Sequence, residues 1–137
     1  MSPARVIAMA ALAFLGLSSL AGAIPMIVDP SGAALQMPLS LLQHSPFHSY
    51  LIPGIILLAF NGLLALLVLW FVMMAKPRYG LWTAFQGLVL LIWLVVECVM
   101  LRLVIWPHYV YGAVALVLVV SGLALRRKNG HRPPVQG

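Results

Sequence analysis

Residues 88–101 read LVLLIWLVVECVML, an apolar stretch that is interrupted by one carboxylic acid, Glu97. A helix crosses the hydrocarbon core of a bilayer with about 20 mostly apolar residues, and the flanks extend this stretch to residues 81–105. A carboxyl group at such depth is costly, and residues of this kind usually face a partner or a cavity. The stretch therefore predicts a membrane span, and Glu97 is the first candidate functional residue.

The composition of the whole chain is also typical of a membrane protein. Of its 137 residues, 64% are hydrophobic and 7% are charged, whereas a soluble domain carries about 25% charged residues. The net charge of +6 comes from basic residues that flank apolar runs, where such residues set membrane orientation. We therefore expect contact with the lipid bilayer and no nucleic-acid binding. The single cysteine, Cys98, excludes an intrachain disulfide and a CxxC redox centre.

Four apolar runs are each long enough to cross a bilayer, and only helices satisfy their own backbone over such lengths in lipid. The spans are expected at about residues 6–28, 50–75, 81–105 and 109–125. They predict an all-α membrane protein, an antiparallel four-helix transmembrane bundle, as a single domain over residues 1–125. A basic cytoplasmic tail follows at residues 126–137.

The first span has two interpretations. Arg5, the apolar stretch after it and Ala21-Gly22-Ala23 are similar to a signal peptide with an A-x-A cleavage site. The apolar run is longer than the ~7–15 residues of a signal core, which favours a retained helix.

Basic residues predict the orientation of the spans. An even number of spans places both termini and the connector at residues 76–79 on one side, together with all seven basic residues that flank the spans. The long loop at residues 29–49 contains no Lys or Arg. By the positive-inside rule the termini are cytoplasmic and the loop is outside.

The outer loop is expected to carry a short amphipathic helix. Asp29-Pro30-Ser31-Gly32 favours a turn, and Pro38 can begin one or two helical turns. Ser45-Pro46 should end them, because the residue before a proline disfavours the α region. Such a helix would lie on the membrane as a lid, either as a plain connector or as the cover of a site.

Polar residues inside the spans form a candidate site. Gln86, Trp93 and Glu97 share one face of the third span, and Asn61 lies near the middle of the second. In one interpretation Glu97 makes a structural hydrogen bond between helices and Asn61 packs against a neighbour. In the other, Glu97 is a proton or ligand site, and Asn61 and Gln86 line the path to it.

Two kinds of partner are considered for Glu97. Ser18 or Ser19 of the first span could share a hydrogen bond with it. Arg102 follows Glu97 by five residues, about 140° around the helix at 100° per residue, so a pair within one helix would be strained. We expect Arg102 to extend to the outer headgroups. A contact with Glu97 or Asp29 across the bundle is the alternative.

Three histidines are expected on the outer side, namely His44, His48 and His108. Together with Asp29 they could bind zinc or copper. Pro46 lies between His44 and His48, so these two need not share a helical face, and the chain has no HExxH motif. The competing interpretation is an interfacial position without metal, and no motif in the chain requires a cofactor.

Several short motifs together resemble an uncharacterised family of small bacterial four-span integral membrane proteins. They are DPSG at 29–32, MPL at 37–39, SPF at 45–47, YLIPG at 50–54 and NG at 61–62. The resemblance covers the outer loop and the spans on either side of it, and it implies the inner membrane of a bacterium without indicating an activity. In size and span number the chain is also similar to DoxX-type proteins. Small multidrug transporters share the size and the single membrane glutamate, but they carry it in the first span.

The sequence favours a non-catalytic integral membrane protein of the bacterial inner membrane. It would act as an accessory subunit or a lipophilic-ligand-binding module, in a homo-oligomer or a larger membrane complex. The alternative is a small proton-coupled transporter that uses Glu97. Transport requires a cavity beside Glu97, and a glutamate that faces lipid or is sealed by a neighbour would exclude it.

Overall fold

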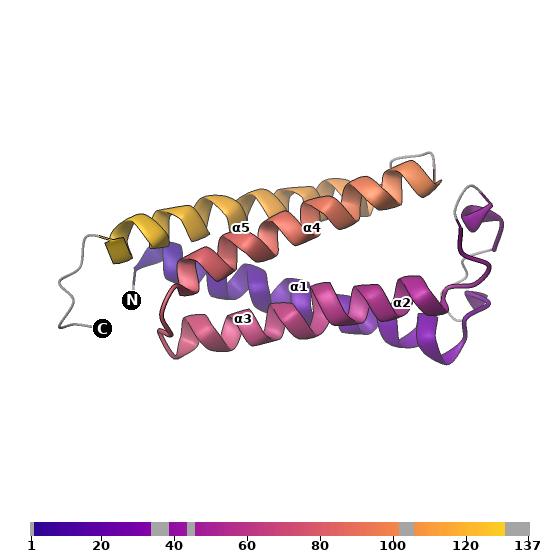
Figure 1. Cartoon of the computed structure of the whole chain (residues 1–137), viewed down its shortest axis with the longest axis horizontal. Coiled ribbons are helices and arrows are strands. Elements are labelled where there is room, and N and C mark those ends of the chain that lie inside the picture. Colours follow the sequence, from indigo (N-terminus) through magenta and orange to yellow (C-terminus); the bar gives the residue numbers. More distant parts are fainter. Residues whose placement is uncertain (1, 34–38, 44–45, 102–105, 131–137) are drawn as a thin grey trace.

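A computed structural model describes residues 2–33, 39–43, 46–101 and 106–130 as a bundle of helices (Figure 1). The elements are α1 (Pro3–Val28), the 3₁₀ turn η2 (Leu39–Leu42), α2 (Leu51–Leu57), the π-helical turn η3 (Leu58–Leu63), α3 (Leu64–Met73), α4 (Tyr79–Leu101) and α5 (Trp106–Gly130). Four helices are long and apolar enough to cross a membrane, by length and composition. They cover Pro3–Val28, Leu51–Met73, Tyr79–Met100 and Trp106–Arg127.

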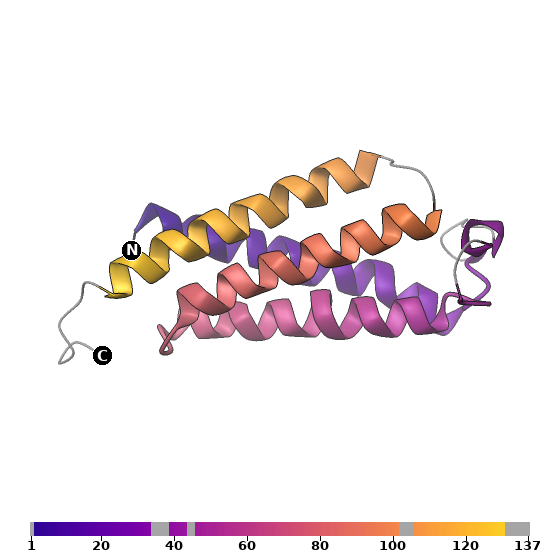
Figure 2. The ribbon, with the colours of Figure 1, turned by 45° about the horizontal axis from the view of Figure 1, so that its top comes forward.

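Consecutive long helices run in opposite directions, with α2, η3 and α3 continuous as one helix (Figure 2). The start of α1, the turn between α3 and α4 and the end of α5 lie at one end of the bundle, and η2 lies at the other. The predicted all-α four-helix bundle is confirmed. The helix expected in the outer loop is a single turn at Leu39–Leu42, and this turn contacts α4.

The helix ends differ from the expected spans by a few residues. Helix α1 begins at Pro3, where Ser2 caps it by accepting a hydrogen bond from the N–H of Arg5. Helix α5 begins at Trp106, before Pro107. A proline is compatible with the first turn of a helix, because the N–H that it lacks has no partner there. Hydropathy alone did not locate these starts.

Helices α4 and α5 approach closely because their contact is lined with glycines. A Cβ atom on Gly122 would lie 2.4 Å from the backbone nitrogen of Ala84. A Cβ atom on Gly80 would lie 2.6 Å from the backbone nitrogen of Arg126, and one on Gly87 would lie 2.9 Å from backbone atoms of α5. Small residues allow such approach between membrane helices. These contacts lie inside the bundle, so a homo-oligomer or larger complex stays a prediction.

The core lies along the middle of the bundle, and α1 contributes buried residues to it as the other long helices do. Helix α1 contacts α2, η3, α3 and α5. The outward faces carry large apolar side chains such as Ile92 and Val99, as expected of a surface that faces lipid. The buried core residues are Ala8, Leu12, Leu15, Ala65, Val68, Val72, Tyr79, Leu90, Leu94, Ala115, Leu118 and Leu125.

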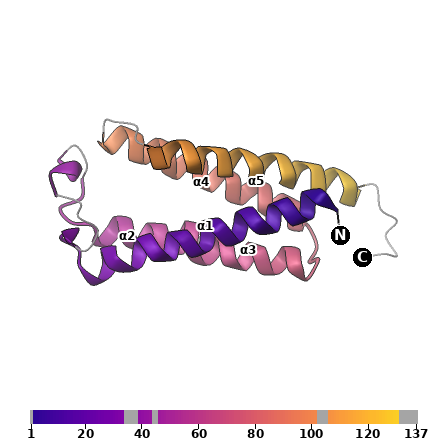
Figure 3. The same cartoon turned by 180° about the vertical axis from the view of Figure 1, so that it is seen from behind.

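The two helix pairs diverge toward the end that carries the outer loop. Figures 1 and 3 show α4 and α5 on one side and α1 with α2 on the other, close together near the chain termini and farther apart at the loop end. Side chains from α1, α2, α4 and α5 line a partly open cavity between the pairs. The divergence therefore creates the space in which the candidate site lies.

Arg5 connects the beginning of α1 to the end of α3. Its Nη2 donates to the carbonyl of Val72 at 2.8 Å and to that of Met73 at 3.0 Å, and its Nε donates to Val72 at 3.2 Å. These carbonyls belong to the last turn of α3, where a helix offers few N–H partners of its own, and the carbonyl of Val72 also accepts a hydrogen bond from the N–H of Ala75 at 3.2 Å. The guanidinium also lies 5.8 Å from the centre of the Tyr79 ring.

Replacing Arg5 with methionine is expected to lower the free energy of unfolding by about 1–2 kcal/mol, because hydrogen bonds from a charged group are lost at a helix end. Thermal unfolding in detergent measures the loss. Arg5→Lys is the control, since it keeps the charge and loses the forked geometry, and we expect an intermediate effect. An Arg5→Met protein as stable as the wild type would contradict this role.

Candidate functional site

Glu97 and His108 meet across the contact between α4 and α5. The Oε2 atom of Glu97 lies 3.1 Å from the Nε2 atom of His108. The side chain of His108 is 6% exposed and that of Glu97 is 29% exposed. His108 is in the first turn of α5, where the helix dipole favours a nearby negative charge. The pair therefore joins two helices near the loop end of the bundle.

His108 takes the place that sequence reasoning gave to Ser18 or Ser19. The hydroxyl of Ser18 donates to the carbonyl of Phe14 within α1, at 2.6 Å. Ser19 lines the nearby cavity. The sequence did contain one indication that His108 is the partner of Glu97. Glu97 and His108 lie at similar distances from the connection between two antiparallel helices, so they come to the same level of the hairpin.

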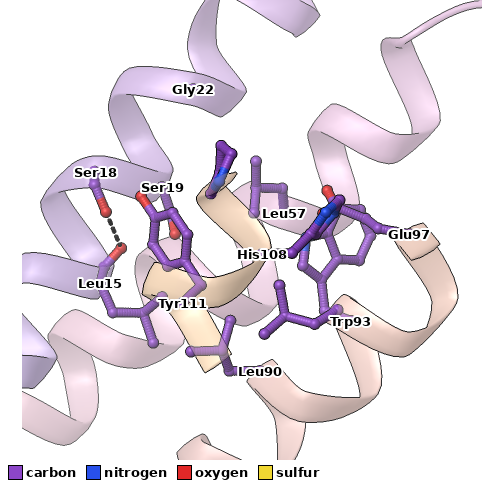
Figure 4. Close-up of a pocket in the computed structure, with 12 residues that line it drawn as sticks. Leu15, Ser18, Ser19, Gly22, Leu57, Leu90, Trp93, Glu97, His108 and Tyr111 are labelled. Carbon is purple, nitrogen blue, oxygen red and sulfur yellow. Dashed lines mark hydrogen bonds and ion pairs between the residues drawn. The ribbon is translucent and has the colours of Figure 1, made fainter. Parts of the chain in front are cut away.

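A cavity of about 160 Å³ lies beside this pair (Figure 4). Figure 4 shows Glu97, His108 and Trp93 close together, with Tyr111 on the side toward α1. Trp93, which the helical spacing placed on the face of Glu97, lines the cavity with it. Glu97 thus has a cavity beside it. The full lining is Leu15, Ser18, Ser19, Gly22, Leu57, Leu90, Trp93, Leu94, Glu97, Pro107, His108 and Tyr111.

Asn61 and Gln86 form a second polar group, separate from the first. Nε2 of Gln86 donates to the carbonyl of Phe60 at 2.9 Å and lies 3.5 Å from Oδ1 of Asn61. Both amide side chains are buried. Neither lines the cavity beside Glu97. The structure thus brings Asn61 and Gln86 together, and it does not join them to Glu97 in one cavity.

The π-helical turn η3 explains why Gln86 reaches this place. The N–H of Leu64 donates to the carbonyl of Ala59, five residues earlier, and not to the carbonyl of Phe60, which would be its partner in an α-helix. Gln86 supplies a donor to that carbonyl. Turns of this kind occur frequently at functional sites. Sequence reasoning missed the turn, and its one signal was Asn61-Gly62, two weak helix formers inside an apolar run.

The histidines of the predicted metal site occupy different surroundings. His108 is hydrogen-bonded to Glu97, and His48 is an exposed residue in the segment that precedes α2. His44 and Arg102 lie outside the described residues. Asp29 accepts a hydrogen bond from the hydroxyl of Ser31 at 2.6 Å. Within the described part of the chain, no three His, Cys, Asp or Glu side chains gather as metal ligands would. The metal site requires His44 and stays a prediction.

Comparison of the chain with protein-family models, with curated proteins and with solved structures finds no match. The resemblance to a bacterial four-span family stays a prediction for the same reason. The chemistry of the site therefore follows from its own residues. They offer an apolar space of modest size with one acid–imidazole pair in its wall.

Proposed function

We propose that the chain is a non-catalytic, multi-pass membrane protein that binds a lipophilic ligand between its helices. The observation that carries this proposal is the cavity of about 160 Å³ beside Glu97 and His108. An apolar cavity of about 150 Å³ accommodates a molecule the size of benzene. The space therefore suits one ring, or the end of a longer molecule whose remainder extends toward lipid.

The Glu97–His108 pair is the polar anchor in this proposal. Glu97 keeps 29% of its side chain exposed while it contacts His108, so a hydroxyl or amine of the ligand can donate to the carboxylate. Hydrogen bonds to charged groups contribute about 1.5–3 kcal/mol. The rings of Trp93 and Tyr111 provide apolar walls. The preferred ligand is thus an aromatic or aliphatic compound with one hydrogen-bond donor.

The basic residues support an inner-membrane location with cytoplasmic termini. Arg5 lies in the first turn of α1, Lys76 and Arg78 between α3 and α4, and Arg126 and Arg127 near the end of α5. These elements meet at one end of the bundle (Figure 1). The positive-inside rule assigns that end to the cytoplasm and the loop with η2 to the outside. We place the protein, as an accessory component of a membrane complex, in a bacterial inner membrane.

Binding of 4-hexylphenol to the purified protein in detergent tests the proposal. Gly22→Phe is expected to weaken binding roughly tenfold or more, because the new ring occupies the volume that the ligand would fill. A Cβ atom on Gly22 would lie 3.8 Å from Cδ2 of Leu57, which is an ordinary contact. The substitution therefore adds the ring without forcing the backbones apart.

Gly112→Phe is the matched control for this experiment. A Cβ atom on Gly112 would have nothing within 4 Å, and Gly112 does not belong to the cavity lining. We expect it to bind 4-hexylphenol like the wild type, as measured by titration calorimetry. Equal affinity in the wild type and both variants, or an absence of binding by the wild type, would contradict the proposal.

A small proton-coupled transporter is the second candidate, and the acid–imidazole pair beside a cavity favours it. Imidazole and carboxylate groups both exchange protons. The pairing of Asn61 with Gln86 away from the cavity means that a continuous polar path would have to form in another conformation. A proton flux that depends on Glu97 would distinguish this candidate from simple ligand binding.

A further inference from the structure

The end of the bundle at which the chain begins is strongly basic. Within the part of the chain that the structure describes, five Lys and Arg residues gather there (Figure 1), at or just beyond the ends of the membrane-spanning helices. Arg5 is half-buried and donates hydrogen bonds to carbonyls at the end of α3. The other four are exposed, and together they are called the cationic surface: Lys76, Arg78, Arg126 and Arg127.

The acidic side chains of the protein lie too far away to neutralise this charge. The sequence contains two of them, Asp29 and Glu97. Asp29 follows the opposite end of α1, 24 residues after Arg5, or about 36 Å along a helix. Glu97 is 18 residues beyond Tyr79, the first residue of α4, or about 27 Å, and it contacts His108. Exposed charges more than about 10 Å apart are largely screened at 0.1 M salt. The counter-charge therefore comes from outside the chain.

Aromatic side chains indicate the depth of the cationic surface in the membrane. Trp70 and Trp82 are 44% and 40% exposed. Both rings pack on Phe71, with centroid distances of 5.7 Å and 5.8 Å. The Nζ atom of Lys76 lies 5.0 Å from the centre of the Trp70 ring. Tryptophan is enriched where the hydrocarbon core meets the lipid headgroups. The ammonium group of Lys76 therefore lies at the level of the lipid phosphates.

The packing of α4 on α5 brings basic residues from two parts of the chain together. A Cβ atom on Gly80 would lie 2.6 Å from the backbone nitrogen of Arg126, so the beginning of α4 lies directly against the end of α5. Arg78 precedes Gly80 by two residues. The cationic surface thus continues from the turn before α4 to the last turns of α5.

We propose that the cationic surface binds the headgroups of anionic phospholipids in preference to those of zwitterionic ones. A phosphate diester is negatively charged, and its oxygens accept the paired hydrogen bonds that a guanidinium group donates. The cationic surface borders the exposed rings of Trp70 and Trp82. One lipid molecule can therefore contact the charges with its headgroup and the rings with its acyl chains, whereas a soluble acidic protein would leave the rings uncovered.

Quenching of tryptophan fluorescence by phospholipids with brominated chains tests the proposal. In the first reporter protein, Trp93→Phe and Trp106→Phe leave Trp70 and Trp82, which lie beside the cationic surface. The vesicles contain equal amounts of phosphatidylglycerol and phosphatidylcholine, and the bromine is carried by one lipid or the other. We expect phosphatidylglycerol to associate roughly three- to fivefold more strongly, as one close basic contact predicts. Raising the salt to about 1 M, where the Debye length is about 3 Å, should reduce this preference.

A second reporter protein is the control for position. Trp106 begins α5 at the opposite end of the bundle and is 75% exposed. It is the reporter that remains when the other three tryptophans are replaced with phenylalanine. Both reporter proteins also carry Arg102→Gln, which removes the one Lys or Arg between residues 79 and 125. We expect Trp106 to report no preference for phosphatidylglycerol. Both leaflets contain both lipids, so the orientation of insertion does not affect the comparison.

Substitutions in the first reporter protein then test the charges themselves. Arg78→Gln with Arg126→Gln is expected to lower the preference to about twofold or less. Arg78→Lys with Arg126→Lys keeps both charges and should retain most of it. The salt dependence provides the same test without a substitution in the cationic surface. Equal association of both lipids with this end, which a soluble acidic partner would predict, overturns the proposal. The same preference at both ends, or one that persists in the glutamine variant, also overturns it.

Discussion

Replacing Gly122 with alanine is expected to lower the free energy of unfolding of the bundle by about 2–3 kcal/mol, at the upper end of the cost of an overpacked core. The added Cβ atom would lie 2.4 Å from the nitrogen of Ala84 and 2.7 Å from the carbonyl oxygen of Gly80. Both atoms belong to the backbone, so no side-chain rotation relieves the contact. Helices α4 and α5 must separate, and the cost exceeds the gain of about 1 kcal/mol that alanine has over glycine in a helix.

Gly112→Ala is the control, because it makes the same chemical change on the same helix. A Cβ atom there has nothing within 4 Å, so only the helix preference remains, and we expect unchanged or slightly higher stability. Thermal unfolding of both variants in one detergent gives the comparison. If Gly112→Ala and Gly122→Ala had equal effects, the close packing of α4 on α5 would not be a source of stability.

The four helices could be predicted because lipid leaves the backbone few choices. A run such as residues 88–101 has no water to satisfy its peptide groups, and a helix satisfies them internally. The positions of helix ends depend on details that hydropathy does not contain. Ser2 caps α1 through the N–H of Arg5, and α5 begins one residue before Pro107. Capping and proline geometry therefore extend both helices beyond their most apolar segments.

The candidate site could be predicted only in part, because sharing a helix face is not the same as sharing a neighbour. Gln86 and Glu97 are both on the face of α4 that points into the bundle. They are 11 residues apart in sequence, however, or about 16 Å along a helix. At its level Gln86 meets the π-helical turn η3, whereas Glu97 meets the first turn of α5. The two residues therefore meet different neighbours in this structure, and a continuous polar path along that face stays a prediction.

Replacing both Glu97 and His108 is expected to lower the free energy of unfolding by less than the sum of the two single replacements. Glu97→Leu leaves the Nε2 atom of His108 without its carboxylate partner, and His108 is 6% exposed. An unpartnered buried polar group costs about 1–3 kcal/mol. His108→Leu is expected to cost less, since Glu97 is 29% exposed. Combining both changes should recover about 1–2 kcal/mol relative to the sum of the single effects, which a double-mutant cycle in detergent measures.

Glu97→Gln distinguishes the hydrogen-bonding role of Glu97 from its capacity to bind and release a proton. An amide at this position can still pair with the imidazole of His108, so we expect stability within about 0.5 kcal/mol of the wild type, as for a substitution that keeps its partner. Additive single effects in the double-mutant cycle would mean that the 3.1 Å contact contributes nothing. Once the double-mutant cycle has shown that the pair interacts, proton flux into proteoliposomes that contain a pH dye distinguishes transport from ligand binding. If the wild type carries a proton flux that a folded Glu97→Gln protein lacks, the pair serves transport. If the two proteins give equal pH traces and Glu97→Gln binds 4-hexylphenol more weakly, the pair serves ligand binding.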